Sequence, residues 1–114
     1  MLKDLAKNYI QAFTNKDIET IATMLNEQFV LVVLEDPVVK RVEGKENALE
    51  AIKSIFASCT QLEFKAKNIY VLEPNTTMIE FTLQLDSTHL QGVGIIEWQN
   101  NQLKELRAYL DITK

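Results

Sequence analysis

The residues best suited to catalysis or ligand binding lie near the end of the chain, in the segment Arg107-Ala108-Tyr109-Leu110-Asp111. Side chains of a β-strand alternate between the two faces of a sheet, so Arg107, Tyr109 and Asp111 share one face if this segment is a strand. A desolvated carboxylate can act as a general base, and a planar guanidinium can bind an anionic group. Alternatively, Asp111 is an exposed carboxylate near the end of the chain, and Arg107 forms a plain surface ion pair.

The other reactive side chains are isolated from one another. His89 is the only histidine, and it follows Asp86-Ser87-Thr88 in a segment typical of a turn. Cys59 is the only cysteine, so we interpret it as a small, semi-buried apolar residue. The sequence contains no Gly-rich phosphate loop, no His/Cys ligand cluster and no nucleophile-elbow pattern. We therefore expect no metal and no other cofactor.

The composition describes an ordinary globular domain. Of the 114 residues, 46% are hydrophobic and 25% are charged, and the formal net charge is −4. This length predicts a single domain, residues 1–114. Because the net charge is negative, nucleic acid and anionic membrane surfaces are expected to be poor partners. Charged residues interrupt the N-terminus early, and the longest apolar run, Phe29 to Leu34, is too short to span a bilayer, so we expect a cytoplasmic protein.

Apolar periodicity predicts three helices. The first carries an apolar stripe at three- and four-residue spacing from Leu2 to Phe13. Asp17 can accept a backbone N–H and is expected to cap a short second helix. A third apolar stripe follows Gly44 and predicts a helix that ends near Ser58.

The strands are predicted from β-branched residues and from alternation. Phe29 to Leu34 is rich in β-branched residues, and Asp36-Pro37 is expected to close it. After the third helix the period changes to two, which predicts strands near 62–67, 79–85, 90–98 and 103–112. Helices followed by a meander of strands predict an α+β domain with three helices packed on one side of a curved antiparallel sheet.

The order of these elements resembles the nuclear transport factor 2-like superfamily, and within it the SnoaL-like group. The segment from Tyr9 to Phe13, followed by Asp17, is similar to that family's first helix and the acidic start of its second. Leu34-Glu35-Asp36-Pro37 with Gly44-Lys45-Glu46 is similar to its first strand and to the glycine that opens its third helix. The closing segment 107–111 is similar to the last strand, where limonene epoxide hydrolases and SnoaL-type cyclases carry Arg, Tyr and Asp at the same spacing.

This resemblance implies a cone that encloses an apolar pocket, and a homodimer formed through the outer face of the sheet. Apolar residues at both parities between Val93 and Trp98 fit a sheet with both faces covered. The resemblance further implies that Asp111 is a general base and that Arg107 and Tyr109 bind the ligand. It gives Tyr9 the place of the tyrosine that ketosteroid isomerases use to stabilise an oxyanion, although Tyr9 equally fits a core tyrosine.

Several further positions carry an alternative to the role that the resemblance suggests. Phe13, Phe56 and Trp98 are candidates for the pocket wall, but aromatic residues at such spacings also form ordinary cores. Asp36 is similar to the catalytic aspartate of ketosteroid isomerases, but the strand before it is three residues too long, which favours a solvated turn residue. Glu80 lies near an acidic position of the epoxide hydrolases, but the expected arginine is absent there, which favours a solvent-facing glutamate.

Two functions follow from the sequence. The leading hypothesis is a protein that binds a compact, largely apolar metabolite and carries out proton transfer or hydration with Asp111 as the base. The alternative is a non-catalytic ligand-binding or dimeric assembly module of the same fold. Catalysis requires Asp111 to be buried beside Tyr9 or Arg107, whereas binding alone requires a cavity of about 300 Å³ or more.

Overall fold

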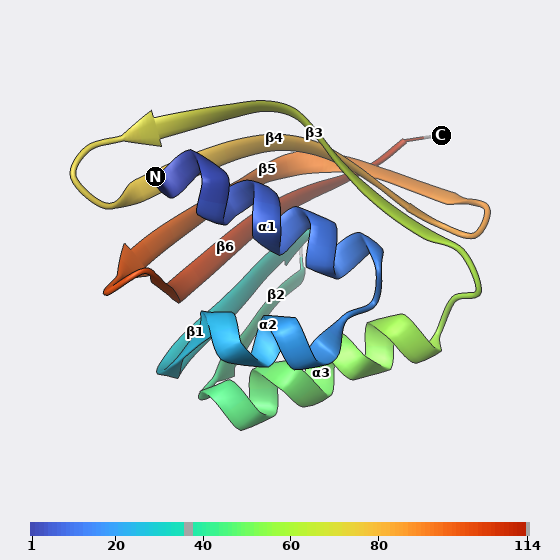
Figure 1. The fold of residues 1–114 in the computed structure, drawn as a ribbon. Coiled ribbons are helices and arrows are strands. Elements are labelled where there is room, and N and C mark those ends of the chain that lie inside the picture. Colours follow the sequence, from blue (N-terminus) through green and yellow to red (C-terminus); the bar gives the residue numbers. More distant parts are fainter. Residues whose placement is uncertain (36–37, 114) are drawn as a thin grey trace.

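The computed structural model describes residues 1–35 and 38–113 and contains three helices and six strands within these ranges (Figure 1). The helices are α1 (Leu2–Thr14), α2 (Ile18–Met24) and α3 (Lys45–Ala57). The strands are β1 (Leu25–Glu35), β2 (Val38–Glu43), β3 (Leu62–Leu72), β4 (Thr76–Leu85), β5 (Thr88–Gln99) and β6 (Gln102–Thr113). All six strands form one sheet in the order β2-β1-β6-β5-β4-β3.

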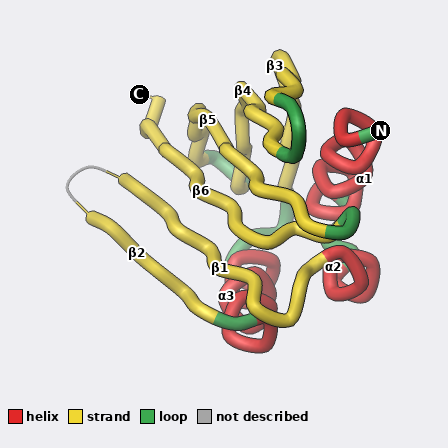
Figure 2. The backbone as a smooth tube through the Cα atoms, turned by 90° about the vertical axis from the view of Figure 1, so that its left-hand side faces the viewer, coloured by secondary structure: helices red, strands yellow, loops and turns green. Residues whose placement is uncertain are grey.

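The sheet is strongly curved, and all three helices lie on its concave side (Figures 1 and 2). α1 packs mainly against β3, while α3 packs against β1 and β2. The convex side carries no helix in the part of the chain that the structure describes. The predicted α+β cone with helices on one side of a curved sheet is therefore confirmed.

The predicted local signals of the helices are found in the structure. The apolar stripe of α1 is buried against the sheet and includes Tyr9 and Phe13. The Asp17 carboxylate caps α2 by accepting hydrogen bonds from the Thr20 backbone N–H at 3.2 Å and from the Thr20 hydroxyl at 2.7 Å. Gly44 precedes α3 with a φ of +92°, a conformation that favours glycine.

A threonine at the end of α1 joins this helix to β3. The Thr14 hydroxyl donates a hydrogen bond to the Phe64 carbonyl oxygen at 2.9 Å and accepts one from the Phe64 N–H at 3.0 Å. The two residues are 50 positions apart in the sequence, so this double contact fixes the helix against the far side of the sheet. It thereby also holds the Phe64 ring in the interior of the cone, where the ring centroids of Phe13 and Phe64 are 5.3 Å apart.

One prediction about the sheet is wrong, and one strand was not predicted. β1 and β6 pair in parallel, so the sheet is mixed rather than antiparallel. Alternation along each segment does not report the direction of strands that are distant in sequence, and β6 returns beside β1 only after three consecutive antiparallel pairings. The strand β2 was not predicted, because its short sequence carries two cationic residues, Lys40 and Arg41. Charged residues of this kind are common on edge strands, and β2 lies at one edge of the sheet.

Candidate functional site

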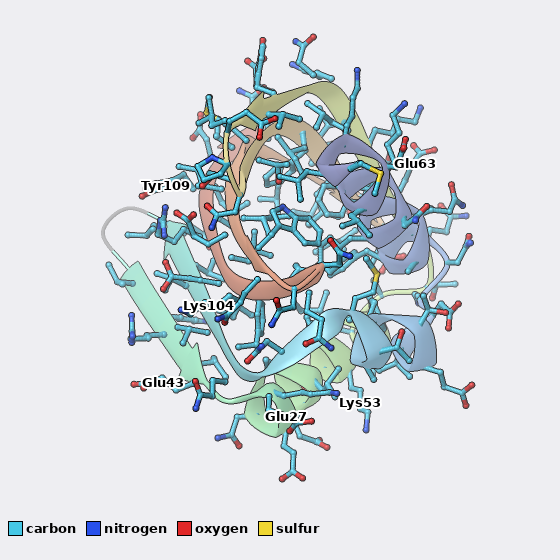
Figure 3. All side chains as sticks on the ribbon, turned by 60° about the vertical axis from the view of Figure 1, so that its left-hand side comes forward. Glu27, Glu43, Lys53, Glu63, Lys104 and Tyr109 are labelled. Atoms are coloured by element: carbon cyan, nitrogen blue, oxygen red, sulfur yellow. The ribbon has the colours of Figure 1, made fainter. Side chains whose placement is uncertain are left out.

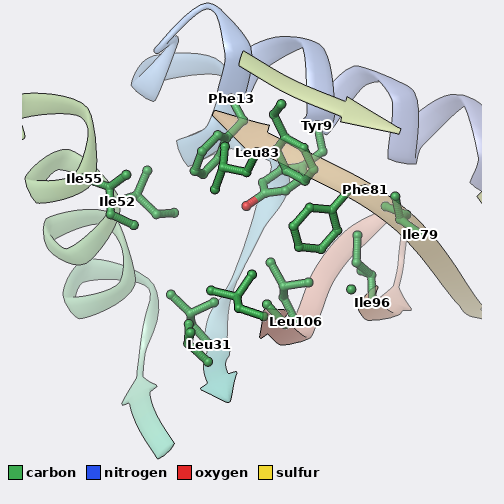
Figure 4. Close-up of a pocket in the computed structure, with 15 residues that line it drawn as sticks. Tyr9, Phe13, Leu31, Ile52, Ile55, Ile79, Phe81, Leu83, Ile96 and Leu106 are labelled. Carbon is green, nitrogen blue, oxygen red and sulfur yellow. The ribbon is translucent and has the colours of Figure 1, made fainter. Parts of the chain in front are cut away.

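A cavity with a volume of about 100 Å³ lies between the helices and the concave side of the sheet (Figure 4). α1 contributes Tyr9 and Phe13 to its wall, and α3 contributes Ile52 and Ile55. Side chains from five of the six strands complete the wall, and all of them are apolar. The cavity is smaller than the volume of about 300 Å³ that the sequence analysis required for a binding site.

Strand alternation determines which residues reach the cavity. On β6 the even-numbered residues Leu106, Ala108 and Leu110 line it, and on β4 the odd-numbered Ile79 and Phe81 do so. The glycine Gly94 on β5 lies opposite Ala108 in the sheet and also lines the cavity. Each of the five contributing strands therefore turns one face toward the cavity, as expected for side chains that point into a core.

Aromatic rings form a continuous cluster along one side of the cavity. The ring centroids of Phe64 and Phe81 are 5.0 Å apart, and both residues line the cavity. Phe13 contacts Phe64 edge to face and has Tyr9 on its other side, with centroids 6.0 Å apart. Phe56 was predicted as a wall residue, but it lies outside the lining and packs against Phe13 with centroids 5.0 Å apart. The cluster presents both ring faces and ring edges to the enclosed space.

The Tyr9 hydroxyl is the one polar side-chain group of the described lining residues. Tyr9 is only 2% exposed, and burial raises the pKa of its hydroxyl well above the usual range, so this group stays protonated at neutral pH. Within the described residues it makes no hydrogen bond to the protein. Figure 4 shows its oxygen directed into the enclosed space. Every fully buried side-chain nitrogen or oxygen of the described residues has a hydrogen-bond partner, so the unpartnered Tyr9 oxygen keeps contact with the space of the cavity.

The three predicted site residues of the closing strand do not reach the cavity. Arg107, Tyr109 and Asp111 lie on the convex side of the sheet, because the even-numbered residues of β6 occupy the concave side. Figure 3 shows Tyr109 pointing away from the interior, and this residue is 44% exposed. Asp111 is also exposed. The expected burial of Asp111 beside Tyr9 or Arg107 is therefore wrong.

Arg107 instead belongs to an ion-pair network on the convex side. Its guanidinium lies 3.1 Å from the Glu97 carboxylate and also contacts Glu105. The Thr76 hydroxyl donates a hydrogen bond to Glu97 at 2.6 Å, and this bond, together with Arg107, holds the pKa of Glu97 below its usual range. Of the two alternatives for Arg107, the surface ion pair is the one found.

The remaining candidate site residues among those described lie in the core or on the surface and not in the wall of the cavity. Trp98 is buried in the core below the cavity rather than in its wall, and its indole N–H donates to the Thr77 hydroxyl at 2.9 Å. Glu80 is held on the convex side by hydrogen bonds from Asn68 and Tyr70. His89 is exposed and Cys59 is buried. Asp36 lies outside the described residues.

No group of three or more His, Cys, Asp or Glu side chains in the described ranges could hold a metal ion. No described helix is long and apolar enough to cross a membrane.

The sequence matches the family model of the SnoaL-like domain over residues 6–106. The chain therefore belongs to the SnoaL-like family. None of the curated proteins matches it. The family assignment agrees with the fold, in which helices close the concave side of a curved sheet over an apolar cavity.

Solved structures resemble the whole fold. An NTF2-like protein of unknown function from Burkholderia xenovorans has a TM-score of 0.83 at 14% identity, covering 98% of this chain and 84% of that one. A protein assigned as a ketosteroid isomerase from Kribbella flavida has a TM-score of 0.80 at 14% identity, with coverages of 97% and 78%. An LEH-like epoxide hydrolase from M. tuberculosis has a TM-score of 0.76 at 19% identity, with coverages of 95% and 80%. At these identities the likeness concerns the fold, and proteins of one fold can differ in activity.

Proposed function

We propose that this protein binds a small, largely apolar molecule in the cavity on the concave side of the sheet. The proposal rests on the Tyr9 hydroxyl, which is the one polar side-chain group in the described lining, faces the cavity and makes no hydrogen bond to the described residues. A water molecule needs two to four polar partners to be held in a cavity, and the lining offers only this hydroxyl. A ligand with an apolar body contacts the wall, and one acceptor atom on it pairs with the Tyr9 hydroxyl.

Binding without proton transfer is the form of this function that we favour. The described lining contains no carboxylate and no histidine, so no general base faces the enclosed space. Asp111, the base that the resemblance suggested, is exposed on the opposite side of the sheet. A carboxylate on that side of the sheet cannot reach a molecule held behind the strand.

The proposal can be tested with general probes of apolar cavities, xenon and benzene, whose binding is followed by NMR shifts of the lining methyl groups. Ala108→Leu adds three carbons on the cavity side of β6 and should abolish the shifts. Asp111→Leu introduces the same side chain on the convex side of the same strand and should leave them unchanged. Unaltered methyl resonances in the wild-type protein at saturating benzene would contradict the proposal.

The convex side of the sheet supports a second proposal, which is self-association. The cross-strand register aligns two mostly apolar rows on this side, and several of their members are exposed, including Val39 at 63% and Tyr70 at 44%. One row contains Val39, Leu34, Tyr109, Val93, Glu80 and Asn68, and the other contains Arg41, Val32, Arg107, Ile95, Met78 and Tyr70. Four of the six residues in each row are apolar or aromatic. Large exposed apolar surfaces of this kind are typical of interfaces.

We propose that a second copy of the chain covers this surface. The resemblance implies pairing through the same side of the sheet. Sedimentation equilibrium should give a dimer, since a stable interface buries about 1,000 Å² or more. Tyr109→Lys places a charge in the middle of the apolar rows and should shift the protein to monomer. Gln11→Lys makes the same change of charge on the exposed side of α1 and should not. A wild-type monomer at high concentration would refute the dimer.

A further inference from the structure

We propose that a groove between α1 and β3 binds an extended, acidic segment of a partner protein. The two elements lie side by side at this edge of the sheet (Figures 1 and 2). The groove has a volume of about 490 Å³ and is lined by side chains of α1 and by the segment 66–69 of β3. It shares no described lining residue with the apolar cavity, so this inference does not depend on the proposed function.

Three lysines give the groove a positive charge. Lys3 and Lys7 come from α1 and Lys67 comes from β3, and no carboxylate belongs to the described lining. All three lysines are exposed, and none forms an ion pair with a described residue. The whole chain carries a net charge of −4, so the positive charge is local. A groove of one sign of charge attracts a partner of the opposite sign.

The positions of Lys3 and Lys7 are unfavourable for the helix that carries them. Lys3 lies in the first turn of α1, where the helix dipole disfavours a cation. Lys7 follows one turn later, and like charges four residues apart repel each other. Asp4, the acidic residue of the first turn, lies 4.0 Å from the N-terminal amine and does not line the groove. Positions that work against local stability are expected where function requires them.

A β-bulge directs Lys67 toward the groove. In a regular strand Lys65 and Lys67 would share the convex side, because side chains alternate. The register between β3 and β4 shifts between Ala66 and Asn68, so Lys67 has no partner on β4. Bulges re-aim side chains and are common beside functional sites. The bulge thus brings a third lysine to the groove from a second element.

Glu80 does not neutralise Lys67. Hydrogen bonds, foremost the one from Tyr70, hold the pKa of Glu80 below its usual range, and the charge of Lys67 adds a smaller part. No ion pair joins these two side chains among the described contacts, and the Glu80 carboxylate is occupied by its own hydrogen bonds. Lys67 therefore remains available to an anionic partner.

The floor of the groove is apolar, whereas its rim is charged. Ile10 is 9% exposed and Ile69 is half-buried, while the three lysines are exposed. An extended peptide with alternating apolar and acidic residues matches both parts, because its side chains alternate between two sides. Such a segment lies in the groove without pairing with the edge of β3, which Thr14 blocks at Phe64.

The spacing of the helical lysines matches this occupant. Lys3 and Lys7 are four residues apart, which corresponds to about 6 Å along a helix. Alternate residues of an extended chain are separated by about 6.6 Å. Two successive acidic residues of the segment can therefore pair with Lys3 and Lys7, and Lys67 reaches the segment from the opposite wall.

Other anionic partners fit the groove less well. The described lining contains no aromatic ring on which a nucleic acid base could stack. The net charge of −4 opposes long polyanions and anionic membrane surfaces. A small anion such as phosphate contacts the lysines but leaves the apolar floor uncovered. An acidic peptide uses both the charge and the floor.

The experiment measures the binding of a fluorescently labelled peptide, Glu-Leu-Glu-Leu-Glu with blocked ends, by fluorescence anisotropy. The matched peptide Gln-Leu-Gln-Leu-Gln lacks the charge. At an ionic strength of about 0.1 M we expect the acidic peptide to bind about tenfold more tightly, since three exposed ion pairs together correspond to about this factor. NMR shift changes should concentrate on the segment 66–69 and on the methyl groups of Ile10 and Ile69.

Charge reversal on β3 provides a matched pair of variants. Lys67→Glu should weaken the binding of the acidic peptide about fivefold, because one ion pair is replaced by a repulsion. Lys65→Glu makes the same change of charge two residues away on the convex side and should alter the affinity by less than about twofold. Lys3→Glu should weaken the binding to the same extent as Lys67→Glu. It should also raise Tm by about 2 °C, because it removes the unfavourable charges in α1.

Several results would overturn this inference. Absence of binding at millimolar acidic peptide would exclude the groove as a docking site, and equal affinity for the two peptides would exclude the lysines as its basis. Equal losses in Lys65→Glu and Lys67→Glu would show that only net charge matters. Displacement of the peptide by an equal concentration of phosphate would assign the lysines to a small anion. Binding of a single-stranded oligonucleotide or of phosphatidylserine vesicles, abolished by Lys67→Glu, would assign them to that partner instead. A lower Tm of Lys3→Glu would show that the lysine stabilises α1 and that its position needs no partner.

Discussion

Replacement of Tyr9 by phenylalanine should make the ligand-free protein more stable. The substitution keeps the ring that packs against Phe13 and removes only the hydroxyl, which is buried and has no hydrogen-bond partner among the described residues. A buried polar group without a partner costs about 1–3 kcal/mol, and the contact of this oxygen with the cavity places the cost at the lower end. Functional sites commonly retain groups that reduce stability in this way.

The size of the effect can be worked out for this chain. We take about 1 kcal/mol for the removal of the hydroxyl. With an unfolding entropy of about 2.1 cal/mol/K per residue, a chain of 114 residues has about 0.24 kcal/mol/K in total, so Tm should rise by about 4 °C. Urea denaturation should show a higher midpoint at an unchanged slope.

Differential scanning calorimetry of the wild-type protein, Tyr9→Phe and the control Ser87→Ala provides the measurement. The Ser87 side chain is exposed in the turn between β4 and β5, so the loss of its hydroxyl should change Tm by no more than about 2 °C. A Tm of Tyr9→Phe that lies below that of the wild type would show that the hydroxyl has a stabilising partner. The reasoning that links this group to a ligand would then be refuted.

Three further predictions concern the stability of the fold. Thr77→Val removes the acceptor of the buried Trp98 indole N–H and should destabilise the protein by about 1–3 kcal/mol, as measured by the fluorescence of this single tryptophan in urea. Gly92→Ala should lower the urea midpoint far more than Gly94→Ala, because a Cβ atom at Gly92 would overlap a backbone carbonyl of the neighbouring strand; equal midpoints would contradict this. Hydrogen bonds from the first turn of α2 hold the pKa of Asp17 below its usual range, so its stabilisation is complete above the unfolded-state pKa and is lost as the pH falls below about 4. Asp17→Asn should therefore show a smaller decrease in Tm between pH 5 and pH 2 than the wild type, and identical pH profiles would argue against the carboxylate as the source.

The helical part of the cavity could be predicted from the sequence, because the apolar stripe of the first helix contains both Tyr9 and Phe13. The periodicity identifies the face of the helix that packs on the sheet, and both residues lie on it. The unpaired state of the Tyr9 hydroxyl could not be predicted, since it depends on the side chains of distant strands that surround it. Only the folded chain shows that none of them offers an acceptor in the described wall.

The closing strand shows where the prediction of the site failed. Alternation alone places the apolar row Leu106, Ala108 and Leu110 toward the core and the polar row toward the outside, and this is the arrangement found. The resemblance to enzymes of the superfamily instead favoured the polar row as the site. Physical periodicity was the better guide here, because burial of an apolar row is favourable regardless of the activity of the protein.

The hydrogen bonds between Thr14 and Phe64 also bear on solubility. β3 is an edge strand, so the backbone groups on its outer side have no neighbouring strand in the sheet. Free N–H and C=O groups of this kind are a template for pairing with another chain and for aggregation. The Thr14 hydroxyl occupies both groups of Phe64 at once, acting as donor and acceptor as a residue of a neighbouring strand would. One side chain of the first helix thus interrupts the free edge of β3 and hinders the addition of another strand there.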